Sequence, residues 1–188
     1  MKDVKRFNKL LKVEKSALLV IDIQEKILPV IKDHQLVVSN TLKLIKGCKI
    51  LGLPVFYTEQ YPKGLGHTLP EIKSELVDAE FFEKMTFSCG GADNLFLRFN
   101  ELNRDQIIVC GIEAHVCVQQ TVLDLLSNDF QVNVAADAIS SRKEKDYSIA
   151  LRRMENYGSE VTSTESILFE LLNICGTDKF RQISKLVK

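Results

Sequence analysis

The chain has 188 residues, 45% of them hydrophobic and 27% charged, which is the composition of one ordinary globular domain. Its 25 basic and 25 acidic residues give a formal net charge of zero, without the basic excess typical of nucleic-acid binders. The sequence holds no apolar run near the roughly 20 residues that a membrane span needs, and its basic N-terminus lacks the apolar core of a secretory signal. We therefore expect one cytoplasmic domain over residues 1–188, with no nucleic-acid or membrane partner.

The first predicted elements follow one another in a strand–helix–strand order. The apolar run Ser16–Gln24 predicts a buried strand that ends near Asp22. Apolar residues spaced three and four apart predict a helix over 34–52, closed by Gly52. A second strand is expected over 53–60, and the Gly- and Pro-rich stretch 61–72 indicates a loop.

The rest of the chain continues the alternation of strands and helices. The short stretch 81–87 fits either a strand end or a turn. After it, the patterns predict helices over 91–103, 115–129 and 144–158, strands over 104–112, 130–140 and 160–163, a helix from Thr164, and a short helix over 177–188. This order predicts a three-layer α/β/α, Rossmann-like fold, with a central parallel sheet flanked by helices on both faces. Such sheets bind ligands at the carboxyl ends of their strands.

Five cysteines are present, an odd number, without a C-x-x-C pair: Cys48, Cys89, Cys110, Cys117 and Cys175. We expect free thiols in a reducing compartment. The three histidines and the dispersed cysteines do not have the spacing of metal ligands, so we expect neither a metal nor another cofactor.

Cys117 stands between a predicted strand and a predicted helix, in the stretch GIEAHVCVQQT. The positive end of a helix dipole stabilises a thiolate and lowers the thiol pKa, and the free backbone N–H groups there can hold an oxyanion. The residues alone leave two interpretations open with equal weight: a nucleophile or a small buried hydrophobic side chain.

Two charged residues are the next candidates. Asp22 interrupts an apolar strand at the expected ligand-binding edge, where it is either functional or a structural cap. Lys84, in FFEKMTFS, is either a solvated surface lysine, which its local sequence favours, or an ammonium beside Cys117 and Asp22.

The remaining polar candidates point to structural or peripheral roles. His115 lies two positions before Cys117, where two helical side chains do not face each other, so a turn or rim role is favoured over a Cys–His pair. His67 fits a substrate loop or the surface, His34 fits a solvated helix start, and Asp137 fits a structural role at a strand end.

Several segments in the right order resemble the isochorismatase-like (cysteine hydrolase) superfamily. They are LLVIDIQEKIL with Asp22, EKMTFS with Lys84, GIEAHVCVQQTVLDLL with Cys117, and the closing segments VNVAADAISSR and VTSTESILFELL. The resemblance covers about residues 16–172. TEQYPKGLG together with GIEAHVC is most similar to the isochorismatase-domain-containing branch.

The resemblance implies an Asp22–Lys84–Cys117 triad on a parallel α/β fold. It also implies a cis peptide bond between Ile112 and Glu113 and an oxyanion hole made by the N–H groups of Glu113 and Cys117. The metal-binding Asp-x-His of the nicotinamidases in this superfamily is missing from YTEQYPKGLGHT, which argues against a zinc-dependent member.

We therefore expect a metal-independent hydrolase that cleaves a small amide, carbamoyl or related C–N substrate through a thioester on Cys117. The expected substrate-binding residues, beside Ile112 and Glu113, are Gln24, Gln60, Tyr61, Leu65 and Phe87. A homo-oligomer, dimer or tetramer, is implied by the resemblance. Three alternatives stay open: an enol-ether hydrolase that protonates through the aspartate, a non-catalytic scaffold, and a redox-sensing thiol with Cys110 or Cys89 as its resolving partner.

Overall fold

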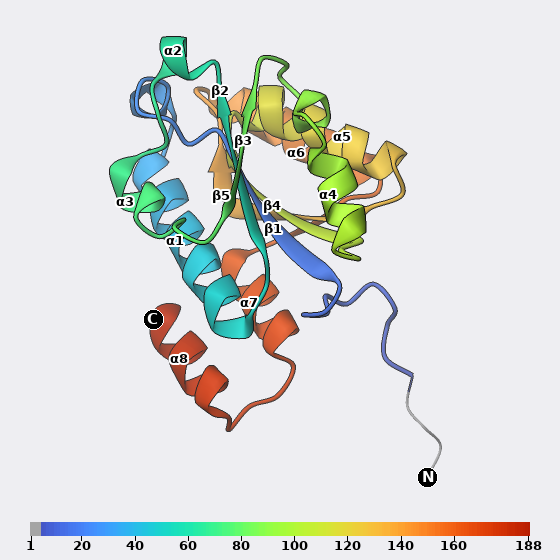
Figure 1. Cartoon of the computed structure of the whole chain (residues 1–188). Helices are drawn as coiled ribbons and strands as arrows, with labels where there is room; N and C mark the ends of the chain where they lie inside the picture. Colours follow the sequence, from blue (N-terminus) through green and yellow to red (C-terminus); the bar gives the residue numbers. More distant parts are fainter. Residues whose placement is uncertain (1–4) are drawn as a thin grey trace.

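A computed structural model describes residues 5–188 and shows one six-stranded sheet with all strands parallel, in the order β3-β2-β1-β4-β5-β6 (Figure 1). The strands are β1 (Ser16–Ile21), β2 (Val55–Gln60), β3 (Glu80–Lys84), β4 (Gln106–Ile112), β5 (Gln131–Ser140) and β6 (Glu160–Thr162). The α-helices are α1 (His34–Leu51), α2 (Pro62–Leu65), α3 (Pro70–Lys73), α4 (Leu95–Glu101), α5 (Gln119–Ser127), α6 (Glu144–Asn156), α7 (Thr164–Leu172) and α8 (Asp178–Leu186). The expected three-layer α/β/α fold is confirmed.

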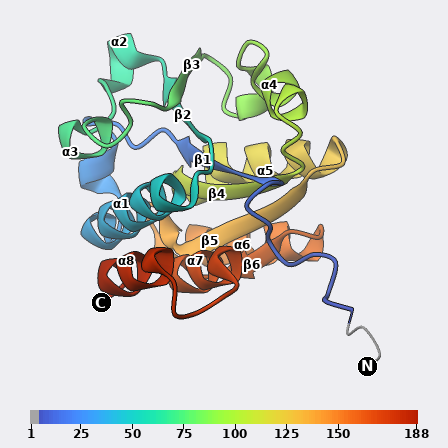
Figure 2. The same cartoon turned by 60° about the horizontal axis from the view of Figure 1, so that its bottom comes forward.

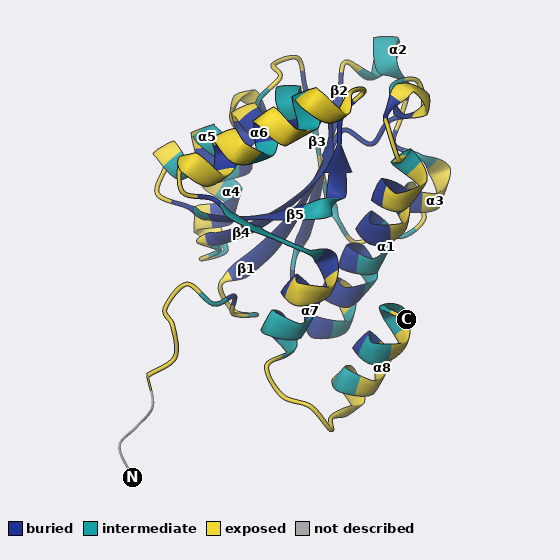
Figure 3. Cartoon of the chain, turned by 180° about the vertical axis from the view of Figure 1, so that it is seen from behind, coloured by how far each residue is buried: buried dark blue, intermediate teal, exposed yellow. Residues whose placement is uncertain are grey.

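The two faces of the sheet belong to two separate hydrophobic cores. Because successive strand residues point to opposite faces, Leu18 and Val20 of β1 pack with α1, α7 and α8, while Leu19 and Ile21 pack with α4, α5 and α6. Figure 2 shows α8 beside α1 and α7, and Figure 3 shows the buried strands between helices with exposed outer faces. Every residue of β1 and β4 is buried, which explains their near-continuous apolar sequence.

Most predicted elements are present, with local differences where turns decide the structure. Gly52 closes α1 at φ 87°, donating its N–H to the carbonyl of Cys48, as expected. The predicted loop 61–72 instead contains the single-turn helices α2 and α3, both started by a proline. The predicted helix 115–129 is divided into a π-helical turn, Ala114–Val118, and α5.

The strand order places a topological switch point between β1 and β4. From β1 the chain proceeds outward through β2 and β3, and from β4 it proceeds the other way through β5 and β6. The connections therefore leave these two neighbouring strands in opposite directions, which opens a crevice at their carboxyl ends. Asp22 follows β1 directly, and the turn that carries Cys117 follows β4. The fold thus brings these two residues to one crevice.

Candidate active site

Asp22 is buried at the end of β1, where the backbone leaves the strand with φ 52°. Its Oδ1 accepts a hydrogen bond from the Thr58 hydroxyl at 2.7 Å, and its Oδ2 accepts one from Lys84 Nζ at 2.6 Å. Asp22 therefore has a partner on each carboxylate oxygen, which offsets the cost of burying the charge.

Lys84 is the last residue of β3, and its side chain is fully buried. Besides Asp22, its Nζ donates to Gln60 Oε1 at 3.1 Å and to the carbonyls of Thr86 at 3.2 Å and Phe87 at 3.0 Å. Burial alone would lower the pKa of Lys84, but the Asp22 charge, the neighbouring thiols of Cys89 and Cys117 and the hydrogen bond to Asp22 together outweigh it, so the pKa is raised. Lys84 is therefore a buried ammonium, and the interpretation as a solvated surface lysine is wrong.

Cys117 lies in the π-helical turn after β4 and is 7% exposed. Its Sγ donates to Gln60 Oε1 at 3.0 Å. Burial raises the pKa of the Cys117 thiol, the charge of Asp22 raises it further, and Lys84 opposes both. The pKa of the Cys117 thiol is therefore raised, contrary to the lowering expected from a helix dipole, because burial and the charge of Asp22 both disfavour the thiolate. The resting side chain is a neutral thiol.

The backbone before Cys117 makes a sharp turn into the site. The peptide bond between Ile112 and Glu113 is cis. The Glu113 carbonyl accepts the N–H groups of Val116 at 3.0 Å and Val118 at 3.2 Å, the two neighbours of Cys117 in the chain. The Glu113 carboxylate accepts a hydrogen bond from Arg142 Nε at 2.7 Å.

These residues surround a cavity of about 220 Å³. Its lining is Asp22, Ile27, Gln60, Leu65, Phe87, Ile112, Glu113, Val116 and Cys117. Five of the nine side chains are apolar, while Asp22, Gln60, Glu113 and Cys117 supply polar groups. Gln60, Leu65 and Phe87 were expected here from the sequence. Ile27 and Val116 were not, because apolar residues of this kind occur throughout the core; their only signal is nearness in the chain to Asp22 and Cys117.

Two expected substrate contacts lie outside this lining. Gln24 is fully buried, and its amide binds backbone groups: Oε1 accepts from Gln60 N at 2.8 Å, while Nε2 donates to the carbonyls of Gln60 at 3.0 Å and Gly66 at 2.6 Å. Tyr61 is 47% exposed, with its ring against Gly64. Gln24 therefore supports the site by holding Gln60, and Tyr61 lies on the surface of the loop.

Each of the three histidines has a hydrogen-bond partner outside the cavity lining. His115 Nδ1 lies 2.9 Å from the Ser141 hydroxyl, and His67 Nδ1 lies 2.9 Å from a carboxylate oxygen of Glu59. His34 Nδ1 contacts the carbonyl of Ile31 at the start of α1. Within residues 5–188, His, Cys, Asp and Glu side chains do not gather in groups of three that could hold a metal ion.

Asp137 has the structural role predicted for it. Its Oδ1 accepts hydrogen bonds from the Thr164 N–H at 2.7 Å and from the Thr164 hydroxyl at 2.9 Å. The carboxylate thereby ties β5 to the first turn of α7, and it lies apart from the cavity beside Cys117.

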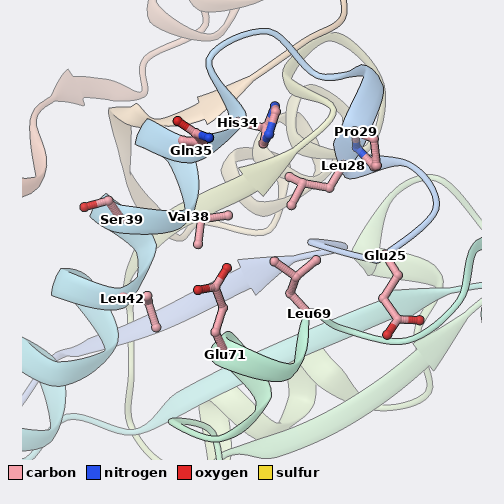
Figure 4. A pocket seen from close by; sticks show the side chains of 10 residues that line it. All are labelled: Glu25, Leu28, Pro29, His34, Gln35, Val38, Ser39, Leu42, Leu69 and Glu71. Atoms are coloured by element: carbon pink, nitrogen blue, oxygen red, sulfur yellow. The ribbon is translucent and has the colours of Figure 1, made fainter.

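A larger cavity, about 610 Å³, lies on the other side of the segment that follows β1 (Figure 4). It is bounded by α1, by Leu28 and Pro29, and by Leu69 and Glu71 near α3. Leu28 faces this cavity while its neighbour Ile27 faces the smaller one, so this segment separates the two. The chemical groups of Asp22, Gln60 and Cys117 belong to the smaller cavity.

The sheet order and the crevice define a doubly wound α/β protein with its site at the switch point. Residues 16–166 match the model of the isochorismatase domain, so the chain belongs to the isochorismatase family of hydrolases.

Known relatives extend this match over most of the chain. The secreted isochorismatase effector Isc1 of Phytophthora sojae is 40% identical over 177 residues, 92% of this chain and 84% of that protein. The structure of MAR1 ribonuclease from Caenorhabditis elegans is 37% identical, with a TM-score of 0.88 over 94% of this chain and 91% of that one. The octameric YcaC hydrolase of unknown specificity from Escherichia coli shares the fold at 22% identity and a TM-score of 0.88, over 97% and 92%.

Among the helices of residues 5–188, none has both the length and the apolar character needed to cross a membrane.

Proposed function

We propose that this protein hydrolyses a small amide, carbamoyl or related C–N compound through a thioester on Cys117. The observation that carries the proposal is a buried carboxylate and a thiol that line one 220 Å³ cavity, with a buried ammonium behind them that is bonded to Asp22 and joined to the thiol by Gln60 Oε1. Such a set can supply a base, a stabilising charge and a nucleophile.

In the proposed reaction, Asp22 accepts the thiol proton when the substrate has entered. Because burial raises the pKa of the thiol, Cys117 needs this base at neutral pH. The thiolate attacks the carbonyl carbon, and the N–H groups of Glu113 and Cys117 hold the oxyanion. The C–N bond then breaks and the amine leaves with the proton from Asp22. Water, deprotonated by Asp22, hydrolyses the thioester, which releases the acid and restores the thiol.

Cavity size and lining support a small, uncharged substrate. A volume of about 220 Å³ is below the roughly 300–1,000 Å³ of typical drug-sized ligand sites. The apolar walls, which include Leu65 and Phe87, suit a short hydrocarbon group beside the reacting carbonyl. The Glu113 charge at the rim is paired with Arg142, so the rim does not select strongly for a cation.

The test is turnover of a panel of short-chain amides and carbamoyl compounds by Cys117→Ala and Asp22→Asn. We expect both variants to lose at least 10³-fold in kcat while they keep the far-UV circular dichroism of the wild type. Wild-type turnover in Cys117→Ala would contradict the covalent route. If Asp22→Asn alone were inactive, the enol-ether alternative, which needs only the aspartate, would take its place.

The name of the C. elegans relative makes RNA cleavage the rival to test. The zero formal net charge and the small cavity both favour a small molecule over a polyanion. Incubation with labelled single-stranded RNA, with Cys117→Ala as the control, distinguishes RNA cleavage from hydrolysis of a small molecule. Cleavage that depends on Cys117 would replace the amide proposal.

The redox alternative is limited by where the other cysteines lie. Cys110 packs in the core on the opposite face of the sheet from Cys117. Cys89 is fully buried beside Thr58, and burial raises its pKa to about 12. A resolving cysteine needs access and thiolate character, so the geometry favours hydrolysis over redox sensing. A Cys89–Cys117 disulfide formed in the folded protein by dilute peroxide would contradict this.

A further inference from the structure

Gln60 occupies an unusual place in the site, because one of its atoms contacts two charged or reactive groups. Its Oε1 accepts from Lys84 Nζ at 3.1 Å and from Cys117 Sγ at 3.0 Å. The side chain is 8% exposed and lines the cavity. A neutral carbonyl oxygen thus connects the ammonium and the nucleophile.

Asp22, the proposed base, accepts from Thr58 on one oxygen and from Lys84 on the other, and in addition to burial, its charge and a hydrogen bond with the Cys117 side chain both raise the pKa of the thiol. The Sγ–H donor of Cys117 is directed to Gln60 Oε1. A hydrogen bond to a neutral carbonyl favours the protonated thiol, because the same oxygen would repel a thiolate.

The backbone of Gln60 is held in place from both sides. Gln24 accepts the Gln60 N–H at 2.8 Å and donates to the Gln60 carbonyl at 3.0 Å. Gln24 stands two residues after Asp22, so the position of Gln60 is tied to that of the proposed base. With its backbone fixed by Gln24 and its side-chain oxygen bound by Lys84 and Cys117, the buried amide of Gln60 has few alternative orientations.

We propose that Gln60 is a positioning residue that orients the Cys117 thiol and the Lys84 ammonium through one carbonyl oxygen and keeps the resting nucleophile protonated until substrate displaces the contact. This inference rests on the proposed cysteine chemistry. It assigns Gln60 a role distinct from substrate binding: Gln60 acts through Cys117 and Lys84.

Two nearly isosteric substitutions are expected to shift the thiol in opposite directions. Gln60→Met removes the acceptor oxygen, so the thiolate gains stability and Cys117 alkylation by iodoacetamide becomes faster at a fixed pH between 7 and 9. Gln60→Glu adds a negative charge, so alkylation becomes slower. We expect the pKa of the thiol to shift by on the order of one unit in each variant. A lower pKa gives more thiolate, but each thiolate is then a weaker nucleophile, so the alkylation rate changes by only about three- to tenfold. In both variants we expect kcat to fall at least tenfold.

The alkylation rates are measured by mass spectrometry of the Cys117 peptide, with the exposed Cys175 as an internal standard. Gln106→Met is the matched control, because Gln106 is an equally buried glutamine at the opposite end of the sheet, bonded to Ser16 and Gln131. We expect its Cys117 alkylation rate to match the wild type. A folding defect could slow or speed alkylation in both Gln60 variants, but it would not give opposite signs.

The outcomes separate this inference from the proposed function. If Cys117→Ala is inactive but both Gln60 variants alkylate at the wild-type rate, or shift in the same direction, the role of Gln60 is overturned and the cysteine mechanism stands. If Cys117→Ala keeps full turnover, the mechanism itself fails, whatever the alkylation rates show.

Discussion

At the scale of single residues, the dominant feature is a buried ion pair. Asp22 and Lys84 lie at 2.6 Å with side chains 4% and 0% exposed. Replacing such a pair by apolar residues can be neutral, whereas removing one partner leaves a charge buried alone. The pair therefore fixes the geometry of the site, and the free-energy cost of burying its two charges is offset only while both residues keep their hydrogen-bond partners.

Removal of the ammonium should be costly. We expect Lys84→Met to lose about 3–5 kcal/mol of unfolding free energy at pH 7, because Asp22 is left charged and buried. Denaturant unfolding measures this loss, with Lys63→Met on the exposed side of α2 as the control. A loss below about 1 kcal/mol would mean that Asp22 is easily hydrated or neutralised, contrary to the contacts described.

At the scale of elements, the loop after β2 owes its position to another buried carboxylate. Glu59 accepts from the Thr68 N–H at 2.8 Å and contacts His67 and Lys73. Burial alone would raise the pKa of Glu59, but the hydrogen bonds from Thr68 and His67 and the charge of Lys73 together lower it. This contact holds the segment that brings Leu65 to the cavity.

The lowered pKa of Glu59 predicts how the stability of the fold depends on pH. A carboxyl group whose pKa is lower in the folded state stabilises the fold above its unfolded pKa, about 4.3, and loses that contribution as pH falls through the folded value. We expect the stability difference between wild type and Glu59→Gln to be largest near pH 7 and to shrink below about pH 4. Urea unfolding from pH 3 to pH 7 tests this, with the exposed Glu14→Gln as control. A difference that grows toward acid pH would contradict it.

The sequence predicted the elements better than the geometry between them. Strand and helix patterns predicted five of the six strands, while for β3 they fitted either a strand end or a turn, and the motif resemblance located Asp22, Lys84 and Cys117. The raised pKa of Cys117 was not predictable, since it depends on burial and on the Asp22 charge, which only the packed site brings together. The double contact of Gln60 was hidden for the same reason: its partners are 24 and 57 positions away in the chain.

At the scale of the whole molecule, the oligomeric state is the property that one isolated chain describes least. We propose a homo-oligomer, a dimer or a tetramer, in keeping with the resemblance to the isochorismatase-like family. Native mass spectrometry should give two or four times the 21.3 kDa of the chain. A monomer at micromolar concentration would contradict the proposal.

Cellular location is likewise a property of the whole protein. We propose a cytoplasmic location, based on the five free cysteines. The relative from Phytophthora sojae is named a secreted effector, so the family includes a secreted member at 40% identity to this chain. Fractionation of cells that express the tagged protein tests this, and recovery mainly from the medium would contradict it.

The most direct test of the central claim is the mass of the intact protein during reaction with p-nitrophenyl esters of short-chain acids, which are activated acyl donors small enough for the cavity. We predict a burst of nitrophenol and a single acyl group on Cys117, which decays in the wild type and persists in Asp22→Asn once it has formed, because the base for hydrolysis is missing. Cys117→Ala should show neither. An unmodified Cys117 in the wild type, with ester cleavage unchanged in Cys117→Ala, would contradict the account.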